Sequence, residues 1–107
     1  MSQSFGELGS LLKAAQQMQR DLDKVREELK NTTVEGVAGG GAVRVLVTGD
    51  RQVTKIDLAP ELFAKPDKGL IEDLLLAALR DGIGKASRMS SEQMGKVTGG
   101  INLPGLF

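Results

Sequence analysis

The chain has 107 residues, enough for one domain with a modest hydrophobic core. It contains no cysteine and no histidine, which excludes disulfides, thiolate metal sites and the nucleophile–histidine pairs of many hydrolases. Fourteen basic residues balance fourteen acidic ones, so an anion-binding surface has to arise from folding or from symmetry rather than from net charge.

Residues 8–30 have the hydrophobic spacing of a long amphipathic helix. Apolar side chains recur alternately every three and four residues, which is a seven-residue repeat with these residues at the a and d positions. They are Leu8, Leu11, Ala15, Met18, Leu22, Val25 and Leu29. Because one small domain offers too little surface to cover so long a stripe, we expect it to serve both the core and a homodimer interface.

Three strand-like segments follow, at residues 32–37, 42–48 and 53–58. Valine alternates with other residues in the second segment, and short glycine-containing connections at 38–41 and 49–52 join the three. Connections of this length and composition are typical of hairpins. The pattern therefore predicts an antiparallel meander.

The glycine cluster Gly39–Gly41 could form either a phosphate-binding loop or a turn. Gly36 and Gly41 have the spacing of the two glycines in the phosphate-loop pattern G-x-x-x-x-G-K-[ST]. However, Ala42 and Val43 occupy the positions of its lysine and hydroxyl residue, and a strand rather than a helix follows. We interpret the cluster as a turn.

A second long helix is expected at residues 67–94, with Asp67 as its N-cap. Gly82 and Gly84 lie inside it, where each costs about 1 kcal/mol relative to alanine, so they indicate close packing or a bend. A glycine-rich apolar tail occupies residues 95–107. The order α-β-β-β-α predicts an α+β fold over residues 1–107, a single domain with a three-stranded antiparallel sheet and two long helices.

Basic side chains on the outer faces of the two helices are the candidate binding residues. They are Lys13, Arg20 and Lys24 in the first helix and Arg80, Lys85 and Arg88 in the second. Taken singly, such residues usually keep a protein soluble, but a homodimer would duplicate and align them into two basic ridges suited to the phosphates of double-stranded DNA. Because phenylalanine is the only aromatic type present, stacking on single-stranded bases is not expected.

No enzyme, cofactor or metal site is expected. The carboxylate pairs, such as Asp21 with Asp23, lie among opposite charges at helical spacing and indicate solvated faces. The clustered oxygen ligands of a calcium loop are absent from the sequence. No apolar run is long enough for a membrane span or a signal peptide, so we expect a cytoplasmic protein without a membrane partner or a small-molecule substrate.

Four blocks in a fixed order carry a resemblance to a known family. They are LLKAAQQMQRDLDKVREEL (11–29), VEGVAGGGAVRVLVTGDRQVTKIDLAPEL (34–62), IEDLLLAALRDGIGKA (71–86) and GGINLPGLF (99–107). Through them the chain resembles, almost from end to end, the YbaB/EbfC family of bacterial nucleoid-associated proteins. No single block is diagnostic, but four similar blocks in the same order, at similar spacing and total length, are strong evidence together.

This resemblance implies a homodimer shaped like tweezers, in which the central sheets associate and the long helices project as arms. It implies binding of double-stranded DNA with limited sequence preference, at the nucleoid, with roles in DNA organisation and gene regulation. DNA contact would fall to the basic positions on the arms named above. The alternative is a dimeric protein–protein adaptor without a DNA role, which the heptad stripe and the zero net charge favour.

Overall fold

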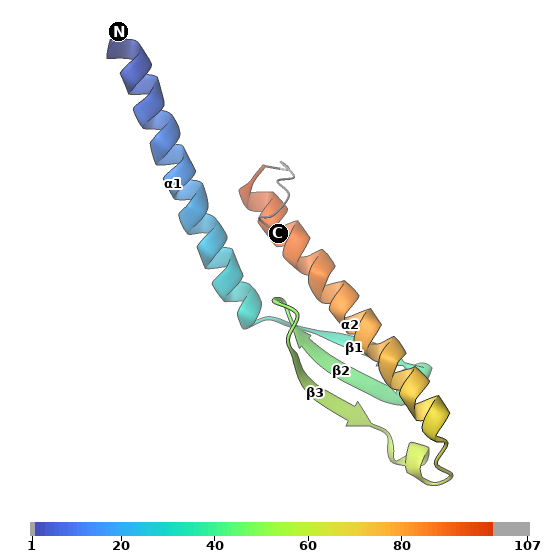
Figure 1. Ribbon diagram of the computed structural model, residues 1–107. Helices are drawn as coiled ribbons and strands as arrows, with labels where there is room; N and C mark the ends of the chain where they lie inside the picture. Colours follow the sequence, from blue (N-terminus) through green and yellow to red (C-terminus); the bar gives the residue numbers. More distant parts are fainter. Residues whose placement is uncertain (1, 100–107) are drawn as a thin grey trace.

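The computed structural model describes residues 2–99. Its elements are two long helices and three strands, with 3₁₀ turns at Gly39–Gly41 and Pro60–Phe63 (Figure 1). In chain order they are α1 (Ser2–Lys30), β1 (Thr33–Ala38), β2 (Val43–Thr48), β3 (Val53–Leu58) and α2 (Lys68–Val97). The predicted α+β fold and its element order are confirmed.

The sheet is an antiparallel meander with the strand order β1-β2-β3, as predicted. The glycine cluster is indeed a turn: Gly39, Gly40 and Gly41 have φ values of 63°, 66° and 100°. This left-handed region is open to glycine and costly for most other residues, which explains why the β1–β2 connection needs glycine.

The main core lies between the sheet and α2. Val43, Val45 and Val47 alternate along β2 toward α2, where they meet the buried Ala78 and Ala86. The helix and β1 approach each other at backbone distance, because a Cβ atom added at Gly36 would lie 2.7 Å from the Cα of Gly82. Gly82 therefore marks close packing, one of the two roles expected of it, whereas Gly84 meets no such constraint.

A smaller second core joins α1 to the C-terminal part of α2. Leu22, Leu29 and Met94 are buried there, with Met18 and Val25 packed against them. The helices run antiparallel, and the N-terminal part of α1 projects beyond α2 (Figure 1), which gives an elongated molecule of 78 × 21 × 16 Å.

Element ends differ from expectation mainly in the helices. The first helix begins at Ser2 rather than at residue 8, in a segment without the apolar repeat that would signal it. The second continues to Val97 rather than ending near residue 94. Asp67 is its N-cap, as expected, and its carboxylate accepts a hydrogen bond from the backbone N–H of Leu70 at 3.1 Å. The predicted tail from residue 100 onward lies outside the described residues.

Candidate nucleic-acid interface

Three of the predicted DNA-binding residues share one face of α1. Lys13, Arg20 and Lys24 are spaced by seven and four residues, close to whole numbers of helical turns. All three are exposed, on the face opposite to the buried Leu22 and Leu29. We call these three cations the basic stripe.

The basic stripe is open to an incoming anion. Within residues 2–99, the side chains of Lys13 and Lys24 make no hydrogen bond or ion pair. Arg20 donates from Nη2 to Oε1 of Gln17 at 2.8 Å, and Gln17 in turn donates from Nε2 to Oδ1 of Asp21 at 2.8 Å. Arg20 is thus held by a neutral amide rather than by a carboxylate, so contact with a phosphate requires no ion pair to break.

The apolar stripe predicted on the opposite face of α1 divides into two parts. Met18, Leu22, Val25 and Leu29 pack within the chain against α2. Leu8, Leu11 and Ala15 lie on the projecting part of the helix and are exposed. The four C-terminal positions therefore belong to the core, while a role of the other three in a dimer stays a prediction.

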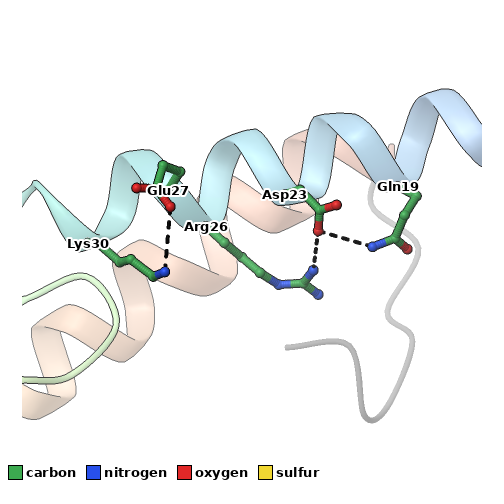
Figure 2. Close-up of polar contacts among 5 residues, drawn as sticks. All are labelled: Gln19, Asp23, Arg26, Glu27 and Lys30. Carbon is green, nitrogen blue, oxygen red and sulfur yellow. Dashed lines mark hydrogen bonds and ion pairs between the residues drawn. The ribbon is translucent and has the colours of Figure 1, made fainter.

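Two further cations of α1 lie on a flank of the helix and are ion-paired. Figure 2 shows Asp23 bonded to both Gln19 and Arg26, and Glu27 paired with Lys30. The distances are 3.1 Å from Arg26 Nη1 to Asp23 Oδ1 and 3.5 Å from Lys30 Nζ to Glu27 Oε2. Exposed pairs of this kind contribute roughly 0–1 kcal/mol to stability and are readily exchanged for another anion.

The predicted residues on α2 have different environments. Arg80 and Arg88 are exposed, but Lys85 is half-buried beside β1. Its Nζ donates to the backbone oxygen of Glu35 at 2.9 Å and lies 3.0 Å from Oδ2 of Asp81. The same Asp81 oxygen accepts the backbone N–H of Val37 at 3.0 Å.

Asp81 and Lys85 thus occupy hydrogen-bonding groups on the outer edge of β1. The N–H of Val37, followed by the Lys85 side chain, lowers the pKa of Asp81 below its ordinary value, because both favour the charged carboxylate. Polar side chains that occupy an edge strand prevent another strand from pairing there. Lys85 therefore has partners within the fold, namely Glu35 and Asp81. DNA contact stays a prediction for Lys85, as it does for the other five predicted DNA-binding residues.

Residues 2–99 contain neither a cluster of metal ligands nor a membrane-spanning helix. Between residues 2 and 99, no group of three or more carboxylate side chains is placed to hold a metal ion. No helix in this range is long and apolar enough to cross a membrane.

The chain is similar to known DNA-binding proteins over nearly its whole length. The YbaB/EbfC DNA-binding family matches residues 5–101. A nucleoid-associated protein of Acetivibrio thermocellus is 45% identical over 103 residues, which cover 95% of this chain and 91% of the relative. One from Pelotomaculum thermopropionicum is 40% identical over 102 residues, covering 95% and 97%.

A solved structure shares the fold. An uncharacterized protein from Helicobacter pylori matches with a TM-score of 0.71 at 24% identity, over 88% of this chain and 96% of the other. Together with the family match over nearly the whole chain, these similarities lead to one conclusion. The chain belongs to the YbaB/EbfC DNA-binding family.

Proposed function

We propose that this protein is a nucleoid-associated protein that binds the phosphate backbone of double-stranded DNA with weak sequence preference. The basic stripe carries the proposal, because it places three accessible cations on one face of a projecting helix. Contacts from such side chains to phosphates fix position on DNA but convey no sequence information. Binding of this kind would organise DNA and influence gene expression in the bacterial cytoplasm.

The DNA-binding form in this proposal is a homodimer, and an apolar surface beside α2 supports it. Val53 and Ile56 of β3 pair with the buried Val47 and Val45 of β2, so they lie on the same face of the sheet. They are nevertheless 41% and 48% exposed. Helix α2 lies over β1 and β2 and leaves most of β3 uncovered, with Leu58 at the end of β3 packed against the core (Figure 1).

The neighbouring flank of α2 extends this apolar surface. Leu76 and Ile83 are exposed two helical turns apart, on the flank opposite to Asp81 and Lys85. Because those two polar side chains occupy the β1 edge, the β3 side is where a second copy would add. A twofold pairing there would give the assembly two arms and two basic stripes.

A salt series of duplex binding tests the proposal. Reversing charge in the variant Arg20→Glu with Lys24→Glu should weaken binding to unrelated duplexes alike. It should also flatten the dependence of log K on log salt by about 0.9 for each DNA phosphate that the protein no longer neutralises. A matched control reverses Lys65 and Lys68, two exposed cations near the start of α2, and should retain the wild-type slope. Absence of duplex binding by the wild type at low salt would refute the proposal.

Sedimentation tests the dimer separately. The wild type should sediment as a dimer at micromolar concentration, and Ile56→Lys should shift it toward monomer, because the substitution places a charge in the apolar surface. A wild-type monomer under these conditions would contradict this part of the proposal.

The adaptor alternative is favoured by one observation, the cluster of Leu8, Leu11 and Leu12 near the free end of α1. These side chains are 53%, 68% and 57% exposed, which is unusual for neighbouring leucines unless a partner covers them. Recovery of one stoichiometric protein partner from nuclease-treated lysate, together with absent duplex binding, would favour the adaptor.

A further inference from the structure

A small hollow lies where the C-terminal end of α1, the β2–β3 hairpin and α2 meet. Its volume is about 200 Å³. The buried side chains of Leu29 and Met94 contribute its apolar part, while Arg26, Lys30, Arg51 and Ser90 supply polar groups from three separate segments. We call these four residues the fork site.

Backbone hydrogen bonds fix the hairpin against α1. The N–H of Gly49 donates to the carbonyl oxygens of Leu29 at 2.8 Å and of Thr32 at 2.9 Å. A Cβ atom at Gly49 would lie 2.7 Å from the Leu29 oxygen, so only glycine permits this approach. The backbone position of Arg51 relative to the end of α1 is therefore set by backbone contacts.

The charges around the hollow favour an anion. Three cations line it against one carboxylate, that of Asp50, which accepts a hydrogen bond from the Thr48 hydroxyl and so is engaged within the turn. The side chain of Arg51 makes no hydrogen bond or ion pair with any residue of the 2–99 range. Arg26 and Lys30 emerge from the same side of α1 (Figure 2), each paired with an exposed carboxylate that solvent screens.

The negative end of the α1 dipole opposes this anion less than a bare helix end would, because the carbonyl groups of Glu27, Glu28 and Leu29 already have donors. The Asn31 side chain donates to the oxygen of Glu27, and the Thr32 hydroxyl donates to that of Glu28. The oxygen of Leu29 accepts from the N–H groups of Thr32 and Gly49. These bonds satisfy groups that otherwise carry the partial negative charge of a helix C-terminus.

We propose that the fork site binds one phosphate group of the DNA backbone, an inference that rests on the proposed DNA-binding function. Arginine presents a planar set of donors that matches phosphate oxygens, and Lys30 and Ser90 add a charge and a hydroxyl donor. The volume suffices for a phosphate with bound water, since each water takes about 30 Å³. The site would anchor DNA at the base of α1, beyond the end of the basic stripe.

A purely structural role makes a different prediction. Arg26 and Lys30 would then serve only to place positive charge near the C-terminus of α1, and Arg51 on the hairpin would be dispensable. A test that removes Arg51 without disturbing the turn therefore separates the two roles. Arg51 has a φ of 65°, a conformation that asparagine adopts more readily than most residues, so Arg51→Asn removes the charge and keeps the turn.

The experiment compares duplex binding by the variant Lys30→Gln with Arg51→Asn and by the control Lys65→Gln with Lys68→Gln. Each double variant removes two positive charges. The fork-site variant should lower the slope of log K against log salt by about 0.9, so its loss of affinity between 50 and 200 mM salt becomes about threefold to fourfold smaller. The control should keep the wild-type slope, and Arg51→Lys, which retains the charge, should stay close to it.

Each outcome leads to a different conclusion. If the fork-site variant has the same slope as the control while the wild type binds DNA, the fork-site proposal is wrong and the proposed function stands. If the wild type fails to bind duplex DNA, both the fork-site proposal and the proposed function are wrong. Thermal unfolding of each variant shows whether folding is retained; if the double variant unfolds early, the single Arg51→Asn variant decides the question by the same slope.

Discussion

The sheet with α2 above it, which we call the base, is packed differently from α1, which we call the arm. In the base, glycines allow helix and strand backbones to touch, and Val43, Val45 and Val47 are at most 1% exposed. The arm is held by side chains along its C-terminal half, where Leu22 and Leu29 meet Met94, and by a backbone contact with Gly49 at its last turn. Methionine adapts to changes in packing, whereas a backbone contact does not.

This difference assigns the two regions different roles. Lysine residues illustrate it: Lys85 in the base bonds to Asp81 and to the β1 backbone, whereas Lys24 on the arm has no such partner among residues 2–99. At these two positions the base uses its lysine to hold the fold, and the arm presents its lysine to solvent. Local opening is therefore expected to be easier in the arm than in the base.

The largest effect is expected where the base is tightest. Gly36→Ala would place a methyl group against the backbone of α2, which cannot move aside as a side chain could. We expect a loss of about 3 kcal/mol or more in the free energy of unfolding, measured by chemical denaturation. The control Gly84→Ala lies in α2, where the nearest atom to an added Cβ is the Arg88 side chain at 3.5 Å. It should leave stability unchanged or raise it by up to about 1 kcal/mol.

A smaller and more local effect is expected in the arm. Leu22→Ala opens a cavity between α1 and α2, and we expect a loss of about 2–3 kcal/mol. Hydrogen exchange should show faster exchange in α1 with β2 still protected, because the arm can loosen without opening the base. The control Leu11→Ala alters a side chain that is 68% exposed and should change stability by less than about 0.5 kcal/mol. Equal acceleration in α1 and β2 would show that base and arm unfold as one unit.

The elements of the fold could be predicted because periodicity is a local property. Alternating valines and a glycine turn define the meander, and the seven-residue repeat defines most of α1. The start of α1 at Ser2 could not be predicted in this way, because its first residues carry no apolar repeat. The division of the apolar stripe into a packed part and an exposed part could not be predicted either, because it depends on where α2 ends in space.

The candidate sites were harder to predict because their residues meet only after folding. Lys85 bonds to the backbone of Glu35, which is 50 positions away, and nothing in the neighbouring sequence distinguishes it from an exposed lysine. Arg51 joins Arg26 and Lys30 only because Gly49 docks against the end of α1. The basic stripe, by contrast, lies within one helix, so spacing alone was enough to group its members.

The smallest effect concerns the response of the base to acid. The pKa of Asp81 is lowered by the N–H of Val37 and by Lys85, so its carboxylate stabilises the base above the ordinary pKa of 3.8 and loses this effect as the pH falls below it. Asp81→Asn should therefore lower the melting temperature near pH 7, and the difference from wild type should disappear in stronger acid. The control Glu72→Gln removes an exposed carboxylate 3.8 Å from Lys68 and should change little at either pH. A difference for Asp81→Asn that persists unchanged in acid would mean that shape rather than charge closes the β1 edge.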